Sequence, residues 1–259
     1  MKLSIIVPVY NEALFIRRCL ESIKLEPDIE VIIIDDGSTD GSWDIIQEYC
    51  DAFKKVRLGT NCGVSYARTL GIMKAHGEYI TFLDADDALT GEGVRNMLKA
   101  IDTRPDAAVI QLDHYRCKNG VCSIEARYHA RPGDYGIRNL PPKWAPVWNK
   151  LYRREFLKEN GIFFPIDQQF DEDRVFNIQC LKHSGGIAFV DYSALKKYFD
   201  NENSLCHTID REKIITALRR LVAMLEDEHD PEILELIKKS ITMHLNSDKF
   251  NRAFQEVKK

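Results

Sequence analysis

Short apolar runs alternate with amphipathic stretches along the first hundred residues of this 259-residue chain. Ser4–Val9 is a continuous apolar run, and Glu30–Asp35 is an apolar run that ends in acid, as is typical of strands in a buried parallel sheet. Glu12–Lys24 has apolar residues at helical spacing. The alternation continues with a helix carrying Trp43, Ile46 and Tyr49, a strand at Val56–Leu58, a helix at Val64–Ala75, a strand at Tyr79–Leu83, a helix at Gly93–Ile101 and a strand at Ala107–Leu112. This order predicts an α/β fold with a mostly parallel, doubly wound sheet.

The pattern changes after Asp113. Asn119-Gly120 is a strong two-residue turn signal, so Tyr115–Tyr128 is a candidate hairpin. Arg131–Pro146 holds four prolines and two glycines and is predicted to be a loop. Further helices are expected at Trp148–Glu159, at Asp173–Lys182 and from Asp210 onward, with Pro231 at a helix start and a strand at Gly186–Tyr198. We expect a catalytic domain over residues 1–205, with halves 1–113 and 114–205, and a C-terminal helical extension over 206–259.

The composition limits the expected cellular location of the protein and the classes of partner that it could bind. A formal net charge of −4 gives no electrostatic reason to expect nucleic-acid binding. No run of about 18 apolar residues is present, and the short N-terminal run is broken by Pro8, so it is interpreted as a strand rather than a signal sequence. Seven scattered cysteines without a CxxC pair predict reduced thiols in a cytoplasm, with neither a disulfide framework nor a zinc site.

Two predicted strands end in carboxylates, at Asp35-Asp36 and at Asp84-Ala-Asp-Asp87. Ligands of open α/β sheets bind beyond the carboxyl ends of the strands. Asp84 and Asp86 are two residues apart, so they point to the same side of an extended segment. Their oxygens suit Mg²⁺ or Mn²⁺ shared with a diphosphate. A solvated acidic turn is the alternative.

Other ways of holding phosphate are missing. The chain has no GxxxxGK[ST] motif, and Gly91–Asn96 lacks the third glycine of GxGxxG. A sugar nucleotidyltransferase should carry a glycine-rich, basic loop after its first strand, whereas Pro8–Ala13 has neither feature. A non-catalytic protein that binds nucleotide sugars remains a second alternative.

Four motifs together resemble family 2 of the inverting glycosyltransferases, which have the GT-A fold. They are SIIVPVYNE at Ser4–Glu12, IDDGSTD at Ile34–Asp40, NxGxxxAR at Asn61–Arg68 and FLDADD at Phe82–Asp87. A fifth, DEDxxF at Asp171–Phe176, is similar to the family's acidic pair ahead of a helix, and WNKLYR at Trp148–Arg153 resembles members that build bacterial surface polysaccharides. The resemblance therefore implies transfer of a sugar from a UDP-sugar to a hydroxyl of a glycan or a lipid-linked glycan.

The resemblance also implies roles for single residues. Asp36 would accept a hydrogen bond from uracil N3–H, and Asp84 would face the ribose and the donor sugar. Asp86 would ligate Mn²⁺ or Mg²⁺. The remaining residues implied for the nucleotide site are Pro8, Tyr10, Glu12, Asn61 and Arg68. For Arg68, a surface ion pair at a helix start is the alternative.

Inverting transfer needs one further carboxylate, because the metal can stabilise the leaving diphosphate as a Lewis acid. That carboxylate would act as general base on the acceptor hydroxyl. Asp173 is the first choice and Glu172 the second; capping of the following helix is the structural alternative. Retention of the anomeric configuration would overturn the assignment of Asp173.

Three features carry weaker predictions. His207 is a candidate third metal ligand or an ordinary polar residue. Lys150 either meets phosphate or acceptor, or is a solvated helix lysine. The tail Ser247–Lys259 has Phe250 and Phe254 among basic residues, a spacing that suits peripheral contact with the inner face of an anionic membrane. Packing of the tail on its own domain is the preferred interpretation.

Overall fold

The computed structural model describes residues 1–49, 51–124, 133–140, 144–168, 170–199 and 211–246. Its strands form one sheet in the order β3-β2-β1-β4-β9-β6-β10-β5, with β7 paired to β6 and β8 to β10. The strands are β1 (Leu3–Val9), β2 (Ile29–Asp35), β3 (Phe53–Arg57), β4 (Tyr79–Phe82), β5 (Ala88–Leu89), β6 (Val109–Lys118), β7 (Val121–Ile124), β8 (Gly133–Gly136), β9 (Lys150–Arg153) and β10 (Gly186–Tyr198).

The sheet is mostly parallel, as predicted. β1 runs parallel to β2 and β4, and β2 runs parallel to β3. β9 is antiparallel to both of its neighbours, so β6 and its parallel partner β10 run in the same direction as β1. The carboxyl ends of β1, β2 and β4 therefore meet at one edge, where the acidic motifs lie.

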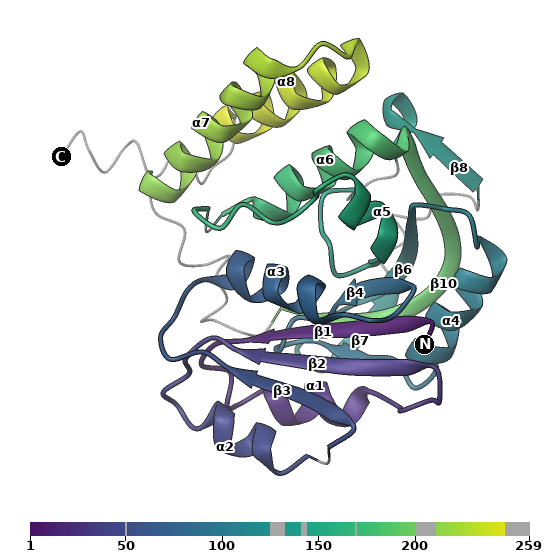
Figure 1. Ribbon diagram of the computed structural model, residues 1–259, viewed down its shortest axis with the longest axis vertical. Coiled ribbons are helices and arrows are strands. Elements are labelled where there is room, and N and C mark those ends of the chain that lie inside the picture. The colour runs from purple at the N-terminus through teal and green to yellow at the C-terminus, as the bar shows by residue number, and fades with distance from the viewer. Residues whose placement is uncertain (50, 125–132, 141–143, 169, 200–210, 247–259) are drawn as a thin grey trace.

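Helices cover both faces of the sheet (Figure 1). They are α1 (Ile16–Ser22), α2 (Ser42–Gln47), α3 (Val64–Lys74), α4 (Gly93–Thr103), α5 (Arg154–Glu159), α6 (Glu172–Ser184), α7 (Arg211–Asp227) and α8 (Pro231–Leu245), with a 3₁₀ turn, η2, at Ile137–Asn139. Alternate residues of β1 serve the two cores: Ile5 and Val7 pack with α1, α2 and α4, whereas Ile6 packs with α3, α5 and α6. Burial on both faces explains why β1 and β2 are mostly apolar.

Three predicted elements differ in the structure. Trp148–Glu159 is not one helix, because Lys150–Arg153 forms the strand β9 and only Arg154–Glu159 is helical. β9 fills the space between β4 and β6 and bonds to both, so tertiary pairing overrides local helix preference. The predicted loop at 131–146 contains β8, which extends the sheet along β10, and the turn η2. The first helix begins at Ile16, later than the predicted Glu12.

The expectation that all cysteines are reduced is wrong at the hairpin. β6 and β7 form the predicted hairpin, with Asn119 and Gly120 both at positive φ in its turn. Cys117 and Cys122 lie opposite each other across this ladder and form a disulfide. Sequence spacing did not reveal the pair, because the hairpin brings together residues five apart without a CxxC motif. Among the described residues, Cys19, Cys62 and Cys180 are free thiols.

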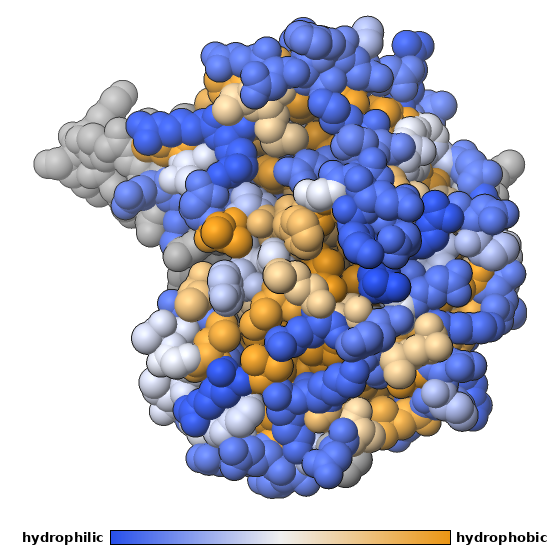
Figure 2. Space-filling view, viewed as in Figure 1, coloured by the Kyte–Doolittle hydropathy of each residue, from blue (hydrophilic) through white to orange (hydrophobic). Residues whose placement is uncertain are grey.

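The C-terminal helices α7 and α8 pack together and lie over α6 (Figure 1). Pro231 starts α8, as predicted, and the side chain of Asp230 caps it by accepting from the amides of Glu232 and Ile233. Figure 2 shows hydrophilic residues over these helices and apolar residues gathered across the middle of the same face. Within the described part of the chain, no helix is long and apolar enough to span a membrane. The predicted domain boundary after residue 205 lies outside the described residues and stays a prediction.

Candidate active site

The loop after β2 is tied to the loop before α3 by Asp36. Both of its carboxylate oxygens accept backbone hydrogen bonds, from the amide of Cys62 at 2.7 Å and from that of Gly63 at 2.8 Å. Gly37 has φ +73° and lies so close to Thr60 that a Cβ would clash with the backbone there. Asp36 is therefore held rigidly at the carboxyl edge of the sheet. Burial, the largest effect on it, raises its pKa, while the two amides lower it.

The predicted nucleoside residues lie beside this loop. Pro8 is buried on β1 opposite Ile34, and Tyr10 follows the end of β1 with 45% of its surface exposed. The amide of Glu12 donates to the hydroxyl of Ser42 at the start of α2. Asn61 is exposed next to Gly37. The structure thus brings the predicted nucleoside residues to one edge, and their exposed side chains face solvent there.

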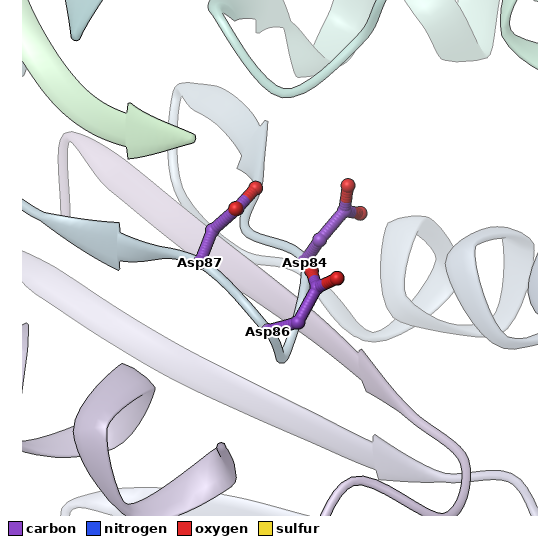
Figure 3. A group of neighbouring side chains, drawn as sticks. All are labelled: Asp84, Asp86 and Asp87. Atoms are coloured by element: carbon purple, nitrogen blue, oxygen red, sulfur yellow. The ribbon is translucent and has the colours of Figure 1, made fainter. Parts of the chain in front are cut away.

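A turn directly after β4 carries three carboxylates, which we name the acidic turn: Asp84, Asp86 and Asp87. One ligand oxygen from each lies within 4.8 Å of the others. Figure 3 shows the three carboxyl groups rising from the same side of the turn, with the end of β10 beside Asp87. The side chain of Asp84 is 21% exposed, whereas Asp87 is fully buried.

Two cations balance this charge. Lys197 on β10 lies 3.1 Å from Asp84 Oδ2 and 2.9 Å from Asp87 Oδ2, and Arg68 on α3 donates to Asp84 Oδ1 at 3.0 Å. Burial alone would raise the pKa of Asp84, but Lys197 and Arg68 outweigh it and lower that pKa to about 2. Asp84 is therefore ionised at neutral pH.

Arg68 joins the acidic turn to the acidic start of α6. It is 4% exposed, and its Nη1 contacts Glu172 Oε1 at 2.9 Å and Asp173 Oδ1 at 2.8 Å. Asp84, Glu172 and Asp173 therefore share one guanidinium. The sequence alternative, a surface ion pair for Arg68, is wrong.

The two carboxylates at the start of α6 both have raised pKa values. Burial and the neighbouring Asp173 raise the pKa of Glu172 to about 7. Burial also raises the pKa of Asp173, against the lowering effect of Arg68. Asp173 is fixed on its other oxygen by the amide of Val147, at 3.2 Å. A general base works best with a pKa near the working pH, so this pair has suitable chemistry.

The alternative of a solvated helix lysine is wrong for Lys150. It lies on β9 with no exposed surface, and its Nζ donates to the carbonyl of Pro146 and to Asn149 Oδ1. Burial lowers its pKa to about 7, with Asp173 opposing that shift. Lys150 therefore holds the 146–149 segment and is shielded from solvent. His207 and the tail 247–259 lie outside the described residues.

Sequence reasoning missed two basic residues at the site. Lys197 enters the acidic turn from β10, far along the chain. Arg18 on α1 donates to the carbonyl of Asp86 and stacks over the ring of Tyr198, 3.7 Å from its centroid. The only available signal was the excess of acid at the strand ends, which requires nearby positive charge but does not say from which segment.

The acidic turn fits a divalent cation. Carboxylate oxygens are the hard ligands that Mg²⁺ and Mn²⁺ prefer, and the three groups converge closely enough to share one ion. Asp84 and Asp86 are the predicted ligands, and Asp87 joins them in the structure.

A mostly parallel sheet with this acidic edge defines the class of the protein, the GT-A fold. The family described as "Glycosyl transferase family 2" matches residues 4–199, and the chain belongs to this family. The match covers both the carboxyl edge of the sheet and the acidic start of α6.

Known proteins agree with this assignment. The chain is 43% identical over 191 residues to an uncharacterized glycosyltransferase of Haemophilus influenzae, covering 70% of this chain and 72% of that protein. It is 32% identical to the uncharacterized glycosyltransferase EpsJ of Bacillus subtilis over 78% of this chain, and it spans 62% of the length of that relative. The crystal structure of Staphylococcus aureus TarS 1–349 in complex with UDP-GlcNAc has the same fold, with a TM-score of 0.81, 22% identity and coverage of 98% of this chain and 75% of TarS 1–349.

Proposed function

We propose that the chain is a metal-dependent, inverting glycosyltransferase that moves a sugar from a UDP-sugar to an acceptor hydroxyl. The observation that carries this proposal is the bridge made by Arg68. One guanidinium contacts Asp84, on the side expected for the donor, together with Glu172 and Asp173, the candidate bases. The carboxylate on the donor side and the candidate bases on the acceptor side therefore lie in one charged cluster. A single displacement requires donor and acceptor to be held together in this way.

The nucleotide half of the proposal rests on Asp36. Each carboxylate oxygen has further acceptor capacity after taking one backbone amide, so Asp36 can still accept from uracil N3–H. Cytosine has no proton there, which favours uridine. Tyr10 and Asn61 would flank the base from the exposed loops. TarS, of the same fold, was crystallised with UDP-GlcNAc and with UDP.

The metal half rests on the acidic turn. Asp86 and Asp84 would hold Mn²⁺ or Mg²⁺, with His207 as the further ligand predicted from sequence. Such an ion supplies Lewis-acid stabilisation of the negative charge that develops on the leaving UDP. Asp84 keeps its negative charge at neutral pH because of its low pKa, so it is available to the cation.

Asp173 would take the proton from the acceptor hydroxyl as it attacks the anomeric carbon. Its orientation is fixed by Arg68 on one oxygen and the amide of Val147 on the other. Glu172 is the second candidate for this role. An acceptor hydroxyl that attacks from the face opposite UDP, with its proton passing to Asp173, predicts inversion.

The acceptor is proposed to be a bacterial cell-surface glycan or a lipid-linked glycan. Relatives include the poly(ribitol-phosphate) β-N-acetylglucosaminyltransferase TarS of S. aureus, at 26% identity, and a poly(ribitol-phosphate) β-glucosyltransferase of Bacillus spizizenii, at 28%. Their names differ in the sugar, so glucose and N-acetylglucosamine donors are the first to test. We further propose a cytoplasmic location, at the inner face of the membrane where the acceptor is lipid-linked. The disulfide between Cys117 and Cys122 is instead typical of an oxidising compartment outside the cytoplasm. Thiol titration of freshly purified protein tests the location, because a cytoplasmic protein should have both cysteines reduced.

Turnover tests the proposed function. The protein is incubated with Mn²⁺, poly(ribitol-phosphate) or lipid-linked glycans, and UDP-glucose or UDP-N-acetylglucosamine, with the GDP-sugars as controls. We expect release of UDP from the UDP-sugars but no release of GDP from the GDP-sugars, and an inverted anomeric configuration of the product by NMR. Retention would remove the role of Asp173. Stoichiometric UDP-sugar binding without turnover of any acceptor would favour a non-catalytic binding protein.

A further inference from the structure

Lys197 occupies the place among the carboxylates that a metal ion would need. Its ammonium lies 3.1 Å from Asp84, 2.9 Å from Asp87 and 3.9 Å from Asp86. The side chain is 17% exposed, and its ammonium lies 5.7 Å from the ring centroid of Trp148. A single cation thus contacts every member of the acidic turn.

We propose that Lys197 is the resident counter-ion of the acidic turn and that it makes metal binding depend on the nucleotide diphosphate. The inference rests on the proposed function, because it takes the acidic turn to be the metal site. Without nucleotide, Lys197 competes with Mn²⁺ for the oxygens of Asp84 and Asp87. With UDP bound, the diphosphate supplies negative charge that accommodates both cations.

The packing explains why the lysine is held there. β5 pairs with β10 at Lys196 and Ala88, so the backbone of β10 runs alongside the chain that leaves the acidic turn. The amide of Tyr198 donates to Asp87 Oδ1, which fixes the strand one residue beyond Lys197. Three carboxylates converging without a cation would repel each other, and Asp87 is fully buried. The ammonium of Lys197 therefore stabilises the three converging carboxylates of the acidic turn.

Competition between the two cations has a measurable consequence. An ammonium and a divalent ion repel each other when they share a carboxylate, so Mn²⁺ alone binds weakly. The diphosphate offsets that repulsion, so UDP strengthens Mn²⁺ binding and, by linkage, Mn²⁺ strengthens UDP binding by the same factor. Removal of the lysine charge should reduce this coupling.

The test is Mn²⁺ binding followed by electron paramagnetic resonance, with and without UDP. Four proteins are compared: wild type, Lys197→Met, Lys197→Gln and the control Lys196→Met, which alters the neighbouring position whose side chain alternates to the other face of the strand. Lys197→Gln keeps a donor for Asp87 in case Lys197→Met folds poorly. We expect both Lys197 variants to bind Mn²⁺ without UDP about tenfold more tightly than wild type, within the usual range of coupling between sites. Lys196→Met should match wild type.

The outcomes separate the two proposals. If the Lys197 variants bind Mn²⁺ alone no more tightly than wild type does, while UDP still enhances binding, the counter-ion role is wrong and the proposed function stands. If neither wild type nor any variant binds Mn²⁺ with UDP present, the metal site of the proposed function is wrong, and the competition inferred for Lys197 falls with it.

Discussion

Asp173 has both carboxylate oxygens engaged, one by Arg68 and one by the amide of Val147. Asp173→Asn keeps an acceptor for the amide but cannot take a proton from an acceptor hydroxyl. We expect kcat to fall by about 10²- to 10⁴-fold, the usual contribution of a general base, with UDP affinity nearly unchanged. Steady-state kinetics and UDP titration measure both. Glu172→Gln is the matched control and should cost less; near-normal turnover in Asp173→Asn would reassign the base to Glu172.

The same pair predicts a pH dependence. Burial raises the pKa of both carboxyls, to about 7 for Glu172, so each binds a proton at a higher pH than in the unfolded chain. A protonated carboxyl cannot act as a base, so kcat should rise with pH, through about 7 if Glu172 is the base and above the usual range of an aspartate if Asp173 is. The raised pKa also means that ionisation of Glu172 lowers the free energy of unfolding over the interval from about 4.5 to about 7. A kcat that stays constant from pH 5 to pH 8 would contradict this account.

The acidic residues at the strand ends could be proposed as site residues from the sequence. The basic residues that contact them could not. The alternation of apolar and acidic residues was enough to propose Asp84 and Asp86 as neighbours. Lys197 and Arg18 escaped prediction because they reach the acidic turn from other elements, through contacts that only the folded sheet creates. Lys150 was misread for a related reason. A lysine is normally expected at a solvent-exposed position. Lys150 is buried because Pro146 and Asn149 accept its hydrogen bonds.

At the scale of elements, α8 reaches the start of α6. His244 Nε2 lies 2.7 Å from Asp171 Oδ2, and Arg174 Nε donates to the same carboxylate at 2.8 Å. Asp171 has φ +59°, a left-handed conformation that costs energy in a residue with a Cβ. Since Asp171 directly precedes Glu172 and Asp173, the C-terminal helices help to fix the orientation of the candidate bases.

His244→Ala should therefore lower both stability and turnover. Loss of a buried partner of a carboxylate costs about 1–3 kcal/mol of unfolding free energy. We expect kcat to fall while the KM for the donor stays constant, since His244 contacts Asp171 and Phe170, next to the candidate bases at the start of α6. Urea unfolding and kinetics check this, with His229→Ala, on an exposed histidine, as the control. A change in donor KM with constant kcat would place the influence of α8 elsewhere.

Helices and strands with a clear pattern of apolar residues were predicted closely. Strands that form only because they pair with neighbouring strands were not. β1, β2 and α6 follow from apolar runs and an acidic helix start. β9 could not be recognised, because Lys150–Arg153 has no strand-like alternation and becomes a strand only between β4 and β6. β8 depends in the same way on β10.

At the scale of the whole molecule, the parallel sheet was predictable, but the order in which its later strands pair was not. The βαβ rhythm ends near Asp113, and the insertion of the antiparallel β9 between β4 and β6 has no local signature. A chain of net charge −4 nevertheless gathers basic side chains, Arg18, Arg68 and Lys197, around its acidic edge. Local charge balance at that edge, rather than overall charge, therefore determines whether an anionic diphosphate can bind.

Thermal unfolding with nucleotides tests the central claim, metal-assisted UDP binding at the acidic edge, most directly. The protein is heated with UDP, GDP, CDP, dTDP or ADP, each with Mn²⁺ or with EDTA. A ligand at about 100 times its Kd should stabilise the fold by about 2.7 kcal/mol. We predict that UDP with Mn²⁺ raises Tm the most, that EDTA removes the effect, and that Asp86→Ala abolishes it. If no nucleotide raises Tm under either condition, the acidic edge is not a nucleotide site and the account is wrong.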